Sequence, residues 1–162
     1  MNHSPKRAFG STEKARRKAV NLDLSTARRM VPLVRSIIRD ILASQEALNR
    51  LEPEHERLES FRRDLPWQQR RRRYQIQEEI AQVRRDLAAA LAELKALGVS
   101  LTDRERGGVD FPTRVNGRPA AYSWLCGEDD IAFWHYSGEE VRRPIPPDWL
   151  DPAPAKRAKW KP

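Results

Sequence analysis

The sequence has little cysteine, little histidine and no long apolar run, and each shortage excludes a class of protein. Cys126 is the one cysteine among 162 residues, which excludes a disulfide framework and favours a reducing compartment. With three histidines in addition, the chain cannot assemble four zinc ligands at a familiar spacing. No apolar run approaches the ~18 residues that span a bilayer, and none follows the basic N-terminus as in a secretory signal. We therefore expect a cytoplasmic protein without membrane contact, metal or cofactor.

Positive charge is present in excess, but it is concentrated at the two ends. The formal net charge is +8. Residues 1–21 carry six Lys or Arg against one Glu, and residues 151–162 carry four against one Asp, so the segment between them is neutral. The ends have almost no large apolar residues, and we expect both to be disordered basic tails. The predicted organisation is therefore one domain over residues 22–150.

Two long helices are predicted over about residues 24–97. Apolar residues recur at intervals of three, four and seven in both halves of this segment, and Pro66 with Gly98 bounds the second helix. The second helix keeps this spacing over three heptads, which indicates a coiled-coil seam. We expect an antiparallel helical hairpin. The two stripes are Met30, Val34, Ile37, Ile41, Leu48 and Leu51, then Ile76, Ile80, Val83, Leu87, Ala90, Leu94 and Leu97.

The period changes to two after Gly98. Residues 109–115 alternate apolar and polar side chains and end at Asn116-Gly117, a strong hairpin signal. Two further strands are predicted at 119–125 and 131–136. The sequence therefore predicts an α+β fold, in which the helical hairpin is followed by a three-stranded antiparallel β-meander over about 99–147.

The hairpin register predicts which side chains share a face of this sheet. If Val115 pairs with Arg118 and Leu125 with Ile131, one face carries Phe111, Tyr122, Trp124 and Trp134. The other face then carries Asp110, Ser123, Phe133 and His135. We expect the aromatic face to pack against the helices. Asp110 and His135 would lie about 10–12 Å apart between Cα atoms, which is too far for most direct hydrogen bonds but close enough to contact one small ligand.

Four consecutive arginines, Arg70–Arg73, lie near the expected tip of the hairpin. Four successive helical residues fan through about 300°, so they cannot form one recognition stripe. Some must face solvent, and others can pair with Glu78 and Glu79 at helical spacing. The acidic residues of the opposing helix could also neutralise the tip: Glu52, Glu54, Glu56 and Glu59. As a functional site, the arginines would contact phosphates together with the basic tails.

The second half of the chain resembles a known family. The motifs are Leu97–Asp103, Gly108–Pro112, Asn116–Arg118, Gly127-Glu128 and Trp134-His135, together with Trp124 and the helical stretch Ala27–Val34. In this order they resemble the bacterial domain of unknown function 2203 over about residues 22–147. The resemblance implies a cytoplasmic protein of no assigned activity, and it marks Asp110, Trp124, Glu128, Trp134 and His135 as candidate ligand-binding residues.

The sequence supplies no convincing nucleophile, so an enzyme is not favoured. Ser123 lies on a strand between aromatic residues rather than on a strained turn. The leading hypothesis is a structural or interaction protein whose helical hairpin self-associates or docks a protein partner. Two alternatives stay open. One is weak, sequence-independent binding of nucleic acid or a ribosome through the tails and Arg70–Arg73, and the other is a small-ligand or metal site around Asp110 and His135.

Overall fold

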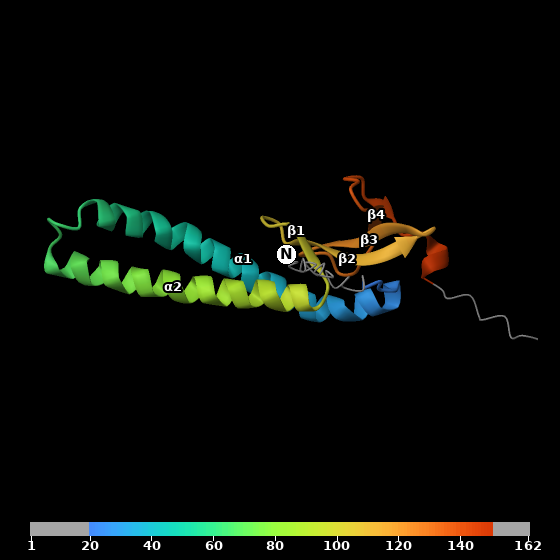
Figure 1. Cartoon of the computed structure of the whole chain (residues 1–162), viewed down its shortest axis with the longest axis horizontal. Helices are drawn as coiled ribbons and strands as arrows, with labels where there is room; N and C mark the ends of the chain where they lie inside the picture. The colour runs from blue at the N-terminus through green and yellow to red at the C-terminus, as the bar shows by residue number, and fades with distance from the viewer. Residues whose placement is uncertain (1–19, 151–162) are drawn as a thin grey trace, which may run out of the picture.

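A computed structural model describes residues 20–150, and it consists of a long helical hairpin and a sheet packed on one end of it (Figure 1). The chain order is α1 (Leu24–Ser60), α2 (Trp67–Ala96), β1 (Ser100–Asp103), β2 (Gly108–Val115), β3 (Arg118–Leu125), β4 (Phe133–Tyr136), β5 (Arg143–Pro144) and a 3-10 turn (Pro147–Trp149). This confirms the predicted α+β class. The two predicted disordered tails lie almost wholly outside the described residues.

The helices begin and end where the sequence signals lie. The carboxylate of Asp23 accepts a hydrogen bond from the backbone N–H of Thr26 at 2.7 Å and so caps the start of α1. Helix α1 runs through Pro32 and Pro53 without interruption. Beyond α2, Gly98 takes a positive φ of 76°, as a glycine at the end of a helix commonly does.

The sheet has five antiparallel strands in the order β1-β2-β3-β4-β5, two more than the predicted meander of about three. The three predicted strands correspond to β2, β3 and β4, and their register is the predicted one: Val115 pairs with Arg118, and Ala121 with His135. The two added strands lie at the edges. Strand β1 has four residues and β5 has two, one of them Pro144, so neither is long enough to produce a period-two pattern.

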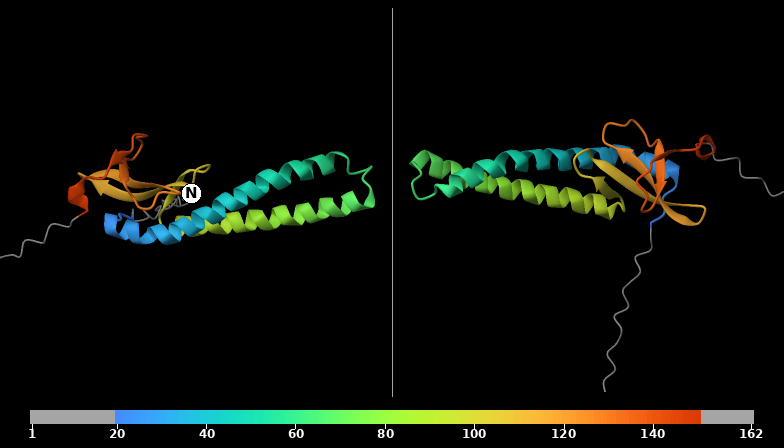
Figure 2. Two further views of the ribbon diagram at one scale, coloured as in Figure 1. Left: turned by 180° about the vertical axis from the view of Figure 1, so that it is seen from behind. Right: turned by 90° about the horizontal axis from the view of Figure 1, so that it is seen from above.

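The sheet covers the N-terminal half of α1, as both views of Figure 2 show. The main core joins this half of α1 to the aromatic face of the sheet, where Phe111 and Trp124 are fully buried. A second, smaller core holds the other end of the hairpin together: Leu51, Leu58, Leu65, Ile76 and Ile80. The hairpin therefore projects from the sheet and ends in a tip with its own core.

Candidate functional site

The polar face of the sheet forms the floor of a pocket. Its volume is about 450 Å³, and its lining includes Asp110, Ser123 and His135 from three adjacent strands. The turn between β1 and β2 supplies Arg106, and the segment between β4 and β5 supplies Arg142. This volume is within the usual range for small-molecule sites.

Asp110 and His135 are in direct contact, contrary to the expected separation. His135 Nε2 lies 3.0 Å from Asp110 Oδ2, and the two side chains are only 14% and 17% exposed. The expectation failed because it used the backbone separation alone. Both side chains lean across β3, and their combined reach bridges two strand spacings.

Two hydrogen-bond acceptors favour the protonated form of His135. Its Nδ1 lies 2.9 Å from the carbonyl oxygen of Tyr136, and its Nε2 faces Asp110. A neutral imidazole has one N–H, so only the protonated ring can donate to both. Burial lowers the pKa of His135, but the hydrogen bonds to Asp110 and Tyr136 outweigh it and raise the pKa above its ordinary 6.5; nearby Arg142 opposes them.

This arrangement is unsuited to activating a serine. Ser123 lies directly opposite Asp110 in the β2–β3 pair, so the three residue types of a hydrolytic triad share one face. However, both ring nitrogens of His135 are engaged by other acceptors. A general base must offer a free ring nitrogen to the hydroxyl, so the geometry does not support nucleophilic catalysis by Ser123. Among residues 20–150, no group of three His, Cys, Asp or Glu is arranged to hold a metal ion.

The raised pKa of His135 predicts a pH dependence of stability. A histidine whose pKa is higher in the folded than in the unfolded protein stabilises the fold fully below pH 6.5, and this contribution is lost as pH rises through the folded value. The free energy of unfolding should therefore fall above pH 6.5, and Asp110→Asn should weaken this fall and lower the pKa of His135. Urea unfolding across pH and NMR titration of the imidazole measure both, and identical profiles in the two proteins would contradict the ion pair.

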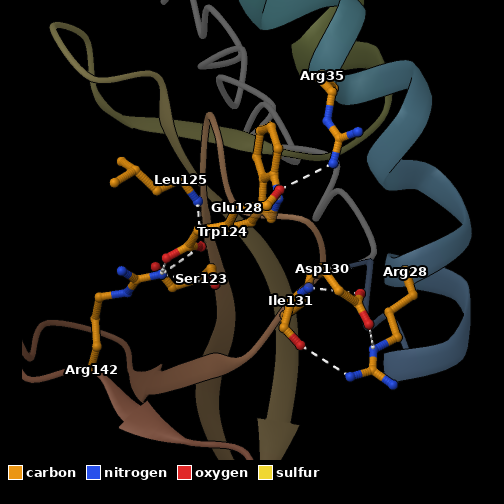
Figure 3. Close-up of polar contacts among 9 residues, drawn as sticks. All are labelled: Arg28, Arg35, Ser123, Trp124, Leu125, Glu128, Asp130, Ile131 and Arg142. Carbon is orange, nitrogen blue, oxygen red and sulfur yellow. Dashed lines mark hydrogen bonds and ion pairs between the residues drawn. The ribbon is translucent and has the colours of Figure 1, made fainter.

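Glu128 organises one wall of the site instead of lying in the pocket. Its carboxylate accepts a hydrogen bond from the backbone N–H of Leu125 at 2.8 Å and pairs with Arg142 at 3.0 Å (Figure 3). Its backbone carbonyl accepts hydrogen bonds from Trp124 Nε1 and from Arg35 Nη2, each at 3.0 Å. Glu128 therefore fixes both the turn after β3 and the position of Arg142.

Two arginines of α1 hold the same turn from the other side. Arg35 donates to the carbonyls of Glu128 and Asp129, and Arg28 pairs with Asp130 at 3.0 Å and donates to the carbonyl of Ile131 (Figure 3). Sequence reasoning assigned these arginines no role. The available signal was their seven-residue spacing, which places them on one face of α1.

The two tryptophans of the predicted ligand set lie on the other face of the sheet. The indole of Trp124 is fully buried in the core, so only its backbone can line the pocket. Trp134 is 8% exposed and its ring packs against Tyr136 and Trp149, at centroid distances of 5.0 and 5.1 Å. The structure thus brings Asp110 and His135 together in the pocket, places Glu128 behind its wall, and separates both indoles from it.

The four arginines of the hairpin tip divide into two pairs. Arg72 bonds Glu54 and Glu79, and Arg73 bonds Glu59 at 2.7 Å. These hydrogen bonds lower the pKa of Glu54 and of Glu59. Arg70 and Arg71 are exposed and form no ion pair within residues 20–150. Acidic residues therefore neutralise two of the four arginines, Arg72 and Arg73.

Exposed aromatic side chains accompany the two unpaired arginines. Phe61, Trp67 and Tyr74 are 63%, 70% and 60% exposed, and all three belong to the tip. Sequence reasoning missed them, although the seven-residue spacing of Trp67 and Tyr74 places both on one face of a helix. We call Phe61, Trp67, Arg70, Arg71 and Tyr74 the tip surface.

Fold and site together define an α+β protein with a projecting helical hairpin and a polar pocket on its sheet. The model of the family DUF2203, described as an uncharacterized conserved protein, matches residues 22–145. The chain belongs to this family. No curated protein and no solved structure matches the chain significantly. None of the helices within residues 20–150 is long and apolar enough to cross a membrane.

Proposed function

We propose that this protein is a non-enzymatic interaction protein, and that the tip of its helical hairpin docks a negatively charged partner. The observation that carries the proposal is the tip surface, where three exposed aromatic rings accompany Arg70 and Arg71. Aromatic residues and arginine contribute most of the binding energy at many interfaces. None of the three rings belongs to the second core, and exposed apolar side chains that gather in one region are typical of interaction sites.

The proposal concerns the tip and not the apolar seam of the hairpin. The seam suggested self-association because it runs for three heptads in a chain that is short of other core material. Within one chain, α1 covers Ile76, Ile80 and Leu94, which are 7% exposed or less. The seam residues between them, Val83, Leu87 and Ala90, are half-buried, so contacts within one chain cover much of the apolar seam. The exposed aromatic rings lie instead at the tip, the end of the hairpin farthest from the sheet (Figure 1).

The charge of the partner follows from how the arginines are paired. Glu54 and Glu59, on the facing helix, are bonded to Arg72 and Arg73. Within residues 20–150, Arg70 and Arg71 have no such carboxylate, and their exposed guanidinium groups suit an external anion. An unpaired arginine presents planar donors that suit carboxylate and phosphate groups.

Charge reversal at the tip tests the proposal. In the full chain, Arg70→Glu/Arg71→Glu should lower the salt concentration that elutes the protein from immobilised heparin by a clear margin. The matched control is Arg39→Glu/Arg50→Glu, which changes the net charge equally at two exposed arginines of α1 outside the tip. Because the basic ends contribute equally to both variants, the difference between them isolates the tip. Equal elution of the two variants would refute docking at the tip.

A second candidate function is binding of a small polar molecule in the sheet pocket. The observation that favours it is the buried Asp110–His135 ion pair on the floor of a pocket of about 450 Å³. A panel of small carboxylates, phosphates and amines, screened by thermal shift against wild type and His135→Ala, tests this candidate. A ligand that raises the Tm of wild type alone would support it, and the absence of any differential shift would retire it.

A further inference from the structure

We infer that the partner of the tip surface is a single-stranded nucleic acid, whose bases stack on Trp67 and Tyr74 while its phosphates bind Arg70 and Arg71. This inference rests on the proposed function and adds the chemical class of the partner. Positions 67, 70, 71 and 74 are separated by three, one and three residues. In an α-helix these intervals place the four side chains in one stripe, at an average direction opposite to Ile76, whose side chain is fully buried in the second core.

The stripe has the dimensions of a short strand. Trp67 and Tyr74 are seven residues apart, which is about 10 Å along α2, or roughly the length of three stacked nucleotides. The two arginines lie between the rings along the helix. The phosphates that join two bases stacked on the rings would therefore lie near the guanidinium groups.

Both types of contact have a physical basis. Every base has a π-face, so stacking on an exposed ring needs no particular sequence. The rings of Trp67 and Tyr74 are 70% and 60% exposed. The guanidinium of Arg73 lies over the Tyr74 ring, 4.5 Å from its centroid, so a base would stack on the other face of that ring. Arg70 and Arg71 are exposed and unpaired among the described residues, so they can neutralise phosphates without first breaking an internal ion pair.

The composition of the stripe is less suited to other negatively charged partners. Protein interfaces are also enriched in aromatic residues and arginine, but their buried centre is mainly apolar, whereas two arginines occupy the centre of this stripe between the rings. Its exposed neighbours Gln68, Gln69 and Gln75 are polar as well. A helix that lies in a membrane surface presents a continuous apolar face, which is absent here. In a duplex the faces of the bases are already stacked, so the rings would have no partner.

Removing the rings while keeping the charge tests the inference. The full chain and its variants are titrated into fluorescently labelled oligouridylate and oligothymidylate, and Kd is measured by anisotropy. Trp67→Ala/Tyr74→Ala should raise Kd at least about tenfold, because two stacking platforms are lost. Trp67→Phe/Tyr74→Phe keeps a ring at each position and should stay within about threefold of wild type. Leu33→Ala/Val141→Ala, which truncates two exposed apolar side chains elsewhere, should leave Kd unchanged.

The arginines have a separate readout. Arg70→Ala/Arg71→Ala should reduce the slope of log Kd against log salt by about 1.4, since each phosphate contact to a single strand contributes roughly 0.7. The aromatic variants should leave this slope unchanged. Agreement with both expectations would support the assignment of bases to the rings and phosphates to the arginines.

The remaining outcomes separate this inference from the proposed function. If the alanine variant of the two rings binds the oligonucleotides as wild type does, while charge reversal at Arg70 and Arg71 still weakens binding to heparin, the nucleic-acid inference is overturned and docking at the tip stands. If the rings matter equally for vesicles containing phosphatidylserine or for polyglutamate, the partner is a membrane or an acidic protein and the inference is again overturned. If neither the rings nor the arginines affect any of these ligands, both proposals fail.

Discussion

Gly107→Ala should lower the free energy of unfolding by about 3 kcal/mol, because two separate costs add at this position. Gly107 has a φ of +69°, a conformation that costs a residue with a Cβ about 1–2 kcal/mol. A Cβ there would also lie 2.5 Å from Ile38 Cγ2 and 2.9 Å from Cys126 Cβ. Ile38 is fully buried and cannot move aside, so the clash adds about 1–3 kcal/mol. Urea unfolding measures the difference.

Gly117→Ala provides the matched control. Gly117 has a similar φ of +76°, but a Cβ on it would meet no atom within 4 Å. Alanine at position 117 has the same cost of a positive φ but causes no clash. In both variants alanine also lowers the conformational entropy of the unfolded chain, which offsets part of that cost. We expect a loss of about 1 kcal/mol or less. Equal losses in the two variants would show that the close packing between the β1–β2 turn and α1 contributes nothing.

The large destabilisation expected at Gly107 illustrates what the sequence could not provide. The hairpin at Asn116-Gly117 was predicted because a two-residue turn needs positive φ at both positions, and the observed values are 51° and 76°. That requirement is local. The requirement at Gly107 comes from Ile38, which is 69 positions earlier in the chain and approaches it only after the sheet has docked on α1.

The same distinction explains which parts of the site could be predicted. The register of β2, β3 and β4 followed from one turn and one loop, so Asp110, Ser123 and His135 were correctly placed on one face. Whether their side chains touch depends on side-chain direction, which the register does not determine. The roles of Arg35 and Arg142 depend on contacts across 93 and 14 residues, for which no short-range pattern exists.

The ion pairs at the tip could be predicted only in part from the sequence. Acidic residues on α1 and a run of arginines on α2 indicated ion pairs, but not which arginine pairs with which acid. The direction of Ile76 into the second core fixes the rotation of α2. That rotation turns Arg72 and Arg73 toward α1 and leaves Arg70 and Arg71 beside Trp67 and Tyr74. The tip surface is therefore a consequence of packing beneath it.

The largest effect on stability is expected at Trp124, a tryptophan in the core, and Trp67 at the tip serves for comparison. Trp124→Ala should lower the free energy of unfolding by about 3–5 kcal/mol, because it removes a fully buried indole and leaves a cavity between the sheet and α1. The change also deletes the hydrogen bond from Nε1 to the carbonyl of Glu128 and the ring beneath the guanidinium of Arg35. A loss of this size is a large part of the roughly 5–15 kcal/mol that stabilises a typical domain.

Trp67→Ala is the matched control, since it is the same substitution at a side chain that is 70% exposed. It should change the free energy of unfolding by no more than about 0.5 kcal/mol. Chemical denaturation followed by circular dichroism measures both variants on one scale. If Trp124→Ala is as mild as Trp67→Ala, the indole of Trp124 does not support the fold, and its place among the candidate ligand-binding residues gains weight. A loss of several kcal/mol instead makes Trp124 a packing residue, which holds the sheet against α1 while Asp110 and His135 occupy the opposite face.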